Sequence, residues 1–382
     1  MAALEASLIW RSDGVGHVDR LILPDNAFLA DGRWTRAAES ARRDGKDILA
    51  AEPWIQPAGL APADYPASHF RMRITPVPGR FYPRAAVAEL AQGPRDMRPV
   101  RLLAVEAGML RVDPNHPLSG REVRLELRMT DLEPAPGMRM RELFDGPGLQ
   151  RPPADPARAY LHLDGFARQD EAGDGQFYCQ PRLTHHLDIA CRGEITRLYR
   201  RFLAPGQRVL DLMSSWVSHL PESLVDLHVA GLGMNRSELS ANPRLAEQVV
   251  KDLNERSDLP WGDACFDSVI CTASIEYLLR PREVLAEVRR VLKPGGICML
   301  TFSDRWFPTK AIRVWGELHP FERLGMVLSL FQGAGFVDLE TETLRGMKRP
   351  SDDKYADQRA FADPMFAVWG RVPACGPERF MG

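Results

Sequence analysis

The chain has 382 residues, of which 45% are hydrophobic and 26% are charged, and its formal net charge at pH 7 is −2. This length predicts two domains, and the mixed composition is typical of a globular protein. The near-neutral charge argues against non-specific attraction to nucleic acid or to an anionic membrane. No apolar run reaches the roughly 20 residues that a membrane-spanning helix needs. We therefore expect neither a membrane nor a nucleic acid as partner.

The first residues show no signal-peptide pattern, and the six cysteines form no CxxC pair and no metal-ligand cluster. This pattern predicts a cytoplasmic, reduced protein without a metal site.

The region that precedes residue 133 is predicted to be rich in β-strands. Residues 69–76, 100–113 and 122–132 alternate apolar and polar side chains with a period of two, and Gly108 is expected to form a turn within the second run. Residues 1–64 show no clear period. We expect one β-rich domain over residues 1–132.

A turn inside this domain carries a recognisable string. Residues 113–120, DPNHPLSG, resemble the D-x-NHPLAG turn of SlyD-like FKBP-type prolyl isomerases, and the match is clearest over residues 70–132. The resemblance implies an FKBP-like β domain with isomerase or chaperone activity. That family also needs an apolar pocket with an Asp and a Tyr from its earlier strands, and residues 1–70 do not supply this set. A degenerate domain that binds a peptide, or packs on its neighbour, is the alternative.

Proline and glycine are dense over residues 133–157, which predicts a linker between two domains. The second domain, residues 158–382, alternates helices and strands. A helix is expected after a cap at Thr184 and another over residues 283–292. The predicted strands of this half are RVLDLM, HVAGLGM, FDSVICTA, ICMLTFS, FVDLETETL and MFAVWGRV. This alternation predicts an α/β fold of the Rossmann type, with a largely parallel sheet covered on both faces.

The segment from 259 to 303 gives this domain a family resemblance. Its LPWGDACFDSV string, followed by VLKPGG, resembles the type 11 group of S-adenosylmethionine (SAM)-dependent methyltransferases, and the likeness extends over about residues 177–372. FYCQPRLTHHLD and DLMSSWVSHLP are similar to an uncharacterised bacterial and plastid branch of that group. The resemblance implies a seven-stranded class I fold, SAM as cofactor and methyl transfer to an acceptor, which is a small molecule or a protein.

The family's first motif falls on a loop without glycine. Its strand-ending acid corresponds to Asp211, and its glycines fall on Met213 and Ser215, where side chains take up space beside the ligand. The acid that binds the ribose hydroxyls falls on Gly233. Asn235, two residues later, is expected to offer the ribose a weaker hydrogen bond.

The other cofactor contacts implied by the resemblance follow later strands. Asp252 corresponds to the acid that meets the adenine amine, and Leu253 would lie against the adenine ring. Ser214 and Ser215 are expected to bond the carboxylate end of the cofactor, and Trp216 to cover its sulfonium. The loop where cofactor and acceptor meet contains Thr272, Ala273 and Ser274.

Methyl transfer is an in-line displacement in which positioning supplies most of the acceleration, so a protein base is optional. His185, His186 and His219 are the candidate bases. Three interpretations stay open: a methyltransferase, a non-catalytic methyltransferase-like binding module with a filled cofactor pocket, and a folding helper that uses its FKBP-like half.

Overall fold

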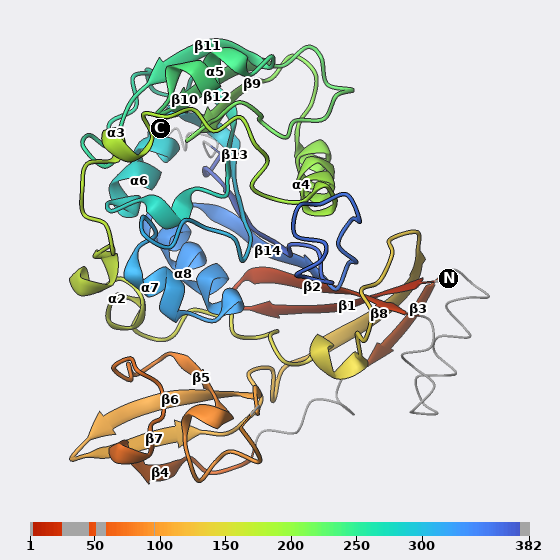
Figure 1. Cartoon of the computed structure of the whole chain (residues 1–382), viewed down its shortest axis with the longest axis vertical. Coiled ribbons are helices and arrows are strands. Elements are labelled where there is room, and N and C mark those ends of the chain that lie inside the picture. Colours follow the sequence, from red (N-terminus) through yellow and green to blue (C-terminus); the bar gives the residue numbers. More distant parts are fainter. Residues whose placement is uncertain (1–2, 25–45, 51–58, 95, 375–382) are drawn as a thin grey trace, which may run out of the picture. The chain divides into compact units, whose positions relative to one another are not determined.

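The computed structural model describes residues 3–24, 46–50, 59–94 and 96–374 (Figure 1). The chain divides into two compact units. Unit 1 comprises Met1–Phe166, Arg313–Ser329 and Thr341–Pro364. Unit 2 comprises Ala167–Ile312, Leu330–Glu340 and Met365–Gly382.

Unit 1 begins with a hairpin in a region where the sequence shows no clear period. β1 (Ala3–Ser12) and β2 (Val15–Pro24) pair antiparallel along their whole length. The turn between them is Asp13-Gly14, with φ of 52° and 83°. Two positive φ angles are what a two-residue type I′ hairpin turn requires, and Asp-Gly is a favoured sequence for it.

The hairpin belongs to a sheet whose other strands lie far from it in the sequence. β8 (Val123–Thr130) pairs antiparallel with β1, and β3 (Lys46–Ala50) pairs with β8. The strand order is β14-β2-β1-β8-β3, in which β14 (Val337–Arg345) contributes its last residues to unit 1. The predicted strand over 122–132 is thus confirmed. Its buried side chains pack with those of the hairpin in one apolar core.

A second, smaller sheet of unit 1 has the order β4-β7-β6-β5. Its strands are β4 (Ala63–Pro66), β5 (Phe81–Pro83), β6 (Pro99–Glu106) and β7 (Met109–Asp113). The predicted strands over 100–113, with their turn at Gly108, are confirmed. The strand predicted over 69–76 is wrong: Phe70 makes only an isolated bridge with Val87. Pro76 and Pro78 lack the N–H groups that a paired strand needs there.

The stretch expected to be a linker, residues 133–157, packs into unit 1. It contains the short helix η4 (Met140–Leu143), and α2 (Pro156–Ala159) begins at its end. Ala135, Leu143 and Leu149 are fully buried. The dense prolines and glycines therefore accompany turns of a packed segment.

Unit 2 has the strand order β11-β10-β9-β12-β13-β15-β14 in the described part of the chain. β9, β10, β11, β12 and β13 pair parallel with their neighbours, and β15 runs antiparallel to β13. The strand bounds are β9 (Arg208–Leu212), β10 (His228–Gly233), β11 (Leu245–Val250), β12 (Phe266–Thr272), β13 (Leu292–Phe302) and β15 (Met365–Arg371). The predicted α/β fold is confirmed for this unit.

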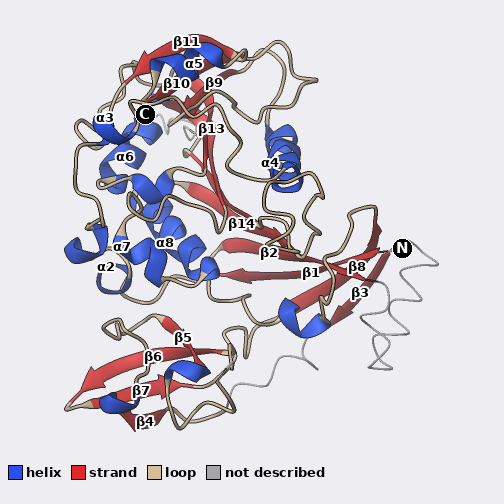
Figure 2. Cartoon of the chain, in the orientation of Figure 1, coloured by secondary structure: helices blue, strands red, loops and turns tan. Residues whose placement is uncertain are grey.

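Helices flank this sheet, and α4 (Ile189–Phe202) and α6 (Pro281–Val291) lie on opposite sides of its strands (Figure 2). α5 (Arg236–Ala241) follows β10, and α3 (Asp174–Phe177) precedes α4. The predicted cap at Thr184 is wrong. Asp188 caps α4, because its Oδ1 accepts a hydrogen bond from the Cys191 N–H at 2.9 Å.

Two further helices lie between β13 and β14. α7 (Arg313–Glu317) belongs to unit 1, and α8 (Pro320–Gly333) begins there and ends in unit 2.

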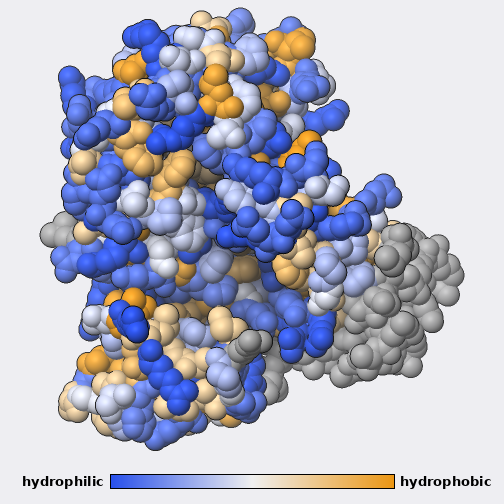
Figure 3. All heavy atoms as spheres, in the orientation of Figure 1, coloured by the Kyte–Doolittle hydropathy of each residue, from blue (hydrophilic) through white to orange (hydrophobic). Residues whose placement is uncertain are grey.

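The face drawn in Figure 3 is mostly hydrophilic, with apolar side chains scattered over it. Among the described residues, no helix combines the length and the apolar character that a bilayer crossing requires. The cytoplasmic location stays a prediction.

Candidate functional site

The candidate site lies at the carboxyl ends of the parallel strands of unit 2. The loops after β9, β10, β11 and β12 carry most of the residues that the sequence singles out. Carboxyl ends of parallel strands share one edge of a sheet, where open α/β folds bind their ligands. The fold therefore brings together side chains that are up to 63 positions apart, from Asp211 to Ser274.

The glycine-free loop keeps a backbone conformation that favours glycine. Met213, where the motif's first glycine falls, has a φ of 56°, in the left-handed region. The next residue, Ser214, donates its N–H to Leu232 O of β10 at 2.7 Å. Met213 therefore adopts, without a glycine, a backbone conformation in which glycine would be unstrained.

Asp211, at the end of β9, is buried with 3% of its surface exposed. The Ser214 hydroxyl donates a hydrogen bond to its Oδ2 at 2.6 Å. Burial raises the pKa of the Asp211 carboxyl to about 6, although hydrogen bonds from Ser214 and Ser218 oppose the rise. This carboxylate is therefore held by its own loop.

Gly233 ends β10, where the motif places the acid for the ribose. A Cβ atom at this position would collide with the backbone oxygen of Ser214 and press on Leu239. The path of the loop after β9 therefore excludes a side chain at Gly233. The missing acid and the missing glycines are two consequences of one loop conformation.

Asn235 is a helix cap. Its Oδ1 accepts from the N–H groups of Ser237 and Glu238, which begin α5. Its Nδ2 donates to Tyr178 O and Cys179 O at 2.9 and 3.1 Å. These four bonds engage the whole amide, so the structure leaves it no group for a ribose hydroxyl.

Ser215 and Trp216 also have partners within the unit. The Ser215 hydroxyl donates to Glu238 Oε2 at 2.7 Å. The Trp216 indole N–H donates to Thr184 O at 3.3 Å, and its ring lies over His185 with 4.6 Å between centroids. The Trp216 ring is half-exposed, which leaves part of it accessible to a ligand.

The loops after β11 and β12 contain the residues that the resemblance assigns to the adenine and to the acceptor side, and these roles stay predictions. Asp252 is half-buried, and its Oδ1 accepts from Asn254 N at 2.8 Å. Leu253 beside it is 3% exposed. After β12, Thr272 Oγ1 is bonded to the Tyr199 hydroxyl at 2.7 Å, and the Ser274 hydroxyl donates to Thr272 O.

The candidate bases lie in and beside this loop system. His185 is bonded through Nε2 to Arg192, and burial together with the Arg192 charge lowers its pKa. Burial, Arg192 and His185 lower the pKa of His219 to about 4. His186 is exposed and meets the Phe307 ring edge to face. At neutral pH His185 and His219 are therefore uncharged and weakly basic.

Sequence reasoning singled out residues 177–188 but did not predict that this segment contacts the loops after β9 and β10. Residues 174–188, here called the strap, run past the carboxyl ends of β9 and β10. The strap receives hydrogen bonds from Asn235 and Trp216, and its Arg182 N–H donates to Glu238 Oε1 at 2.7 Å. The Arg182 guanidinium lies 4.4 Å from the centroid of the Phe177 ring. The segment has no helical or strand period, so its sequence did not indicate where it packs.

The strap is anchored by buried charges. Lys310 is fully buried, with its Nζ 3.3 Å from Asp174 Oδ1 and 2.6 Å from Ala172 O. Arg168 pairs with the same Asp174 oxygen at 2.7 Å, and Asn254 donates to its Oδ2. The network ties the start of the strap to the loop after β11.

The residues at this site suit the adenine of SAM better than its ribose. Asp252 and Leu253 match an adenine, and the turn at Met213 matches the motif's backbone. The ribose lacks its carboxylate, because no side chain fits at Gly233. The structure thus excludes the usual carboxylate ribose acceptor at Gly233, while the adenine contacts of Asp252 and Leu253 stay predictions.

Comparison with known proteins agrees with this geometry. Residues 216–300 match the family model described as "Methyltransferase domain". The chain is 31% identical over 128 residues to a demethylmenaquinone methyltransferase of Renibacterium salmoninarum, covering 31% of this chain and 54% of that protein. A demethylmenaquinone methyltransferase of Symbiobacterium thermophilum is 27% identical over 194 residues, covering 42% of this chain and 71% of that protein.

Among solved structures, a SAM-dependent methyltransferase from Archaeoglobus fulgidus aligns with a TM-score of 0.35 and 15% identity, covering 47% of this chain and 94% of that chain. Because this TM-score is low, the assignment depends on the sequence matches. The family match supports SAM as the cofactor. Residues 216–300 thus match a methyltransferase domain family, and the chain spans about half the length of the Renibacterium relative.

Proposed function

We propose that the chain is a SAM-dependent methyltransferase whose cofactor turn is closed by side chains in place of glycine. The observation that carries the proposal is Met213, which keeps the left-handed φ of 56° that the motif's glycine would adopt. A loop that merely filled an abandoned pocket would have no reason to retain this strained conformation, which costs a non-glycine residue roughly 1–2 kcal/mol.

Asp252 accepts the adenine amine in this proposal, and Leu253 packs against the ring. The half-exposed ring of Trp216 would stabilise the sulfonium of bound SAM by a cation–π contact. Bound SAM supplies an electrophilic methyl group on its sulfonium sulfur. The residues of this chain contribute position and exclude water, and no side chain has to remove a proton when the acceptor is already nucleophilic.

The absent ribose acid has a cost. A charged hydrogen bond is worth roughly 1.5–3 kcal/mol, so affinity for SAM is expected to be about 10- to 100-fold below that of a site with the acid. Substitution of Gly233 by Asp would not recover it, because the Ser214 backbone occupies the required space.

The names of the relatives suggest which methyl acceptor to test first. Two of them are demethylmenaquinone methyltransferases, so the reduced quinone is the first acceptor to test. The full chain would be incubated with methyl-tritiated SAM and this quinol, and separately with small-molecule and protein fractions of a cell extract. Label in an acceptor, with matching release of S-adenosylhomocysteine, supports the proposal. Saturable SAM binding without product in any fraction would favour the non-catalytic binding module.

For unit 1 we propose a SlyD-like FKBP architecture in which the DPNHPLSG turn is a structural joint and isomerase activity is lost. Asn115 Oδ1 accepts from Gly59 N and Leu60 N, and its Nδ2 donates to Asp113 Oδ1. His116 is bonded to Phe144 O at 2.8 Å. These bonds join the turn to residues 59–60, to the end of β7 and to the segment after η4, which supports a role in the fold.

The aromatic pair near this turn is also structural. Phe81 and Tyr82 are 6% and 5% exposed, and the Tyr82 hydroxyl accepts from Val77 N. A proline-peptide isomerisation assay on the full chain tests the proposal. A rate equal to buffer is expected, and a rate that rises in proportion to protein concentration would contradict it.

A further inference from the structure

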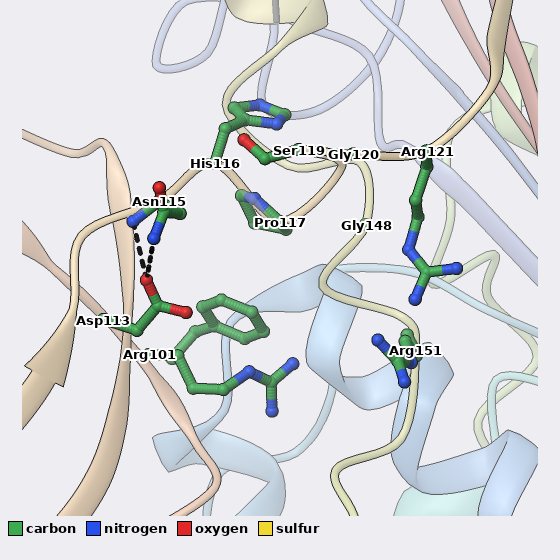
Figure 4. Close-up of a pocket in the computed structure, with 11 residues that line it drawn as sticks. Arg101, Asp113, Asn115, His116, Pro117, Ser119, Gly120, Arg121, Gly148 and Arg151 are labelled. Carbon is green, nitrogen blue, oxygen red and sulfur yellow. Dashed lines mark hydrogen bonds between the residues drawn. The ribbon is translucent and has the colours of Figure 1, made fainter. Parts of the chain in front are cut away.

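Unit 1 contains a pocket of about 370 Å³ beside the DPNHPLSG turn, outside the residues matched to the methyltransferase family (Figure 4). Its walls come from three parts of the unit: strands β5 and β6, the turn that leads into β8, and the segment after η4. A pocket of this size accommodates a small metabolite.

Three arginines from these separate segments line the pocket: Arg101, Arg121 and Arg151. Figure 4 shows their guanidinium groups on the same side of it. Two of them are anchored. Arg101 lies over the Phe81 ring at 4.0 Å and donates to Gly79 O at 2.6 Å, and Arg151 Nε donates to Asp13 Oδ2 at 3.1 Å. Anchored guanidiniums lose little conformational entropy when they bind an oxyanion.

The third arginine is available. The Arg121 guanidinium makes no hydrogen bond or ion pair with any residue that the structure describes. Burial lowers the pKa of both Arg101 and Arg121, and the charge of Arg151 lowers both further. Asp13 opposes this lowering of the pKa at Arg121, and Tyr160, Glu322 and Asp113 oppose it at Arg101. The guanidiniums thus repel one another across a partly desolvated space, and an anion between them would relieve that repulsion.

The pocket also contains a hydrogen-bond acceptor, the carboxylate of Asp113. Asp113 and Asn115 lie across the pocket from Arg121 and Arg151, and Asp113 is the cross-strand neighbour of Arg101 (Figure 4). Asp113 Oδ1 accepts from the backbone and side-chain N–H groups of Asn115 at 2.9 and 2.6 Å. No bond to Oδ2 is formed within the described residues, so this oxygen can accept from a hydroxyl or an ammonium group of a ligand.

We propose that this pocket binds a small organic anion, with a phosphate or carboxylate group held by Arg101, Arg121 and Arg151 and a hydroxyl or ammonium group held by Asp113. Guanidinium forks match both oxyanions in geometry. The site is separate from the methyltransferase residues of unit 2, so its test does not depend on the proposed activity.

The experiment is isothermal calorimetry on the full chain at constant ionic strength, with inorganic phosphate, glycerol 3-phosphate and malate as probes. We expect saturable binding of glycerol 3-phosphate or malate, which separates a phosphate from a carboxylate ligand, and tighter binding of glycerol 3-phosphate than of inorganic phosphate. Arg121→Gln should weaken binding at least tenfold. Arg111→Gln, which removes the same charge from the exposed face of β7, should leave it unchanged.

Asp113→Asn adds a readout that general electrostatics would not give. This variant should bind inorganic phosphate more tightly, because a repelling charge is gone, and should lose part of the preference for the hydroxylated probe. The proposal is overturned if no probe binds saturably, or if Arg111→Gln weakens binding as much as Arg121→Gln does. Arg151→Gln serves as a second pocket variant if Arg121→Gln changes the melting temperature.

Discussion

The backbone oxygen of Ser214 lies where a side chain on Gly233 would begin. This contact joins the two departures from the methyltransferase motif, since the loop that lacks glycine also removes the space for the ribose acid. The loop after β9 therefore determines how a cofactor would be held.

Gly233→Ala is therefore expected to destabilise the protein. The added methyl meets backbone and the Leu239 side chain, and overpacking of this kind costs about 1–3 kcal/mol. The free energy of unfolding would be measured by urea denaturation. Gly193→Ala is the matched control, because Gly193 lies on the exposed face of α4 with no atom near its added Cβ, so stability should stay equal or rise by up to ~1 kcal/mol. Equal stability of Gly233→Ala and the wild type would show that the loop does not pass this close.

Met213→Gly should change stability little. Glycine relieves the left-handed conformation, a gain of roughly 1–2 kcal/mol, but loses more backbone entropy on folding, a cost of about 0.5–1 kcal/mol. Met213→Val provides the contrast, because a β-branched residue at positive φ is strained, and it should be clearly less stable than the wild type. If valine is tolerated as well as glycine, Met213 does not hold the turn described here.

Asp211 gives a pH signature. Its pKa in the folded state is raised to about 6 by burial, whereas an unfolded Asp titrates near 4. Between these values the folded protein binds more protons than the unfolded chain, so this group makes stability fall as pH rises from about 4 to 6 and stay level above that. The shift corresponds to roughly 3 kcal/mol at neutral pH.

The measurement compares the wild type with Asp211→Asn from pH 4 to 8, since an amide still accepts from the Ser214 hydroxyl and does not titrate. Glu322 of unit 1, whose pKa burial raises to about 7, is present in both proteins and cancels in the difference. The variant should gain stability relative to the wild type as pH rises to about 6. A difference that is flat over this range would contradict the buried, loop-held carboxylate.

Two substitutions of Asn235 distinguish its role as the cap of α5 from its role in holding the strap. Asn235→Asp keeps an oxygen to cap α5 but loses the donors to Tyr178 O and Cys179 O, whereas Asn235→Ala loses both. The aspartate variant should release the strap while α5 stays capped, which limited trypsin digestion would detect as faster cleavage after Arg182. The alanine variant should be less stable by a further ~1 kcal/mol. Equal cleavage rates of the wild type and Asn235→Asp would contradict the claim that the Asn235 amide holds the strap.

Sequence alone predicted the core of unit 2 well, because buried parallel strands such as RVLDL and SVICT are continuous apolar runs between helices of clear period. The β1–β2 hairpin was not predicted. Asp13-Gly14 is a strong hairpin turn sequence, but the strands that flank it lack a clear apolar–polar alternation. The cap of α4 was misplaced by four residues, because Thr184 and Asp188 both suit a cap and only the path of the chain decides between them.

The site was predicted in part. The family resemblance singled out Asp211, Asp252 and Thr272, which the structure places at or just after the carboxyl ends of β9, β11 and β12, and their roles stay predictions. The engagement of Asn235 depends on the strap, a segment without periodicity that becomes visible only through tertiary contacts. The arginine pocket of unit 1 is also a tertiary feature, because its three guanidiniums come from positions 20 to 50 residues apart.

The central claim is that this altered turn still holds a cofactor, and calorimetry with S-adenosylhomocysteine on the full chain tests it most directly. We expect saturable binding at sub-millimolar to millimolar ligand, weakened about tenfold by Asp252→Ala, since a charged acceptor is removed. Glu340→Gln, an exposed charge change on β14, should leave the affinity unchanged. Absence of heat and of thermal stabilisation at millimolar ligand, or binding that ignores Asp252→Ala, would contradict the account.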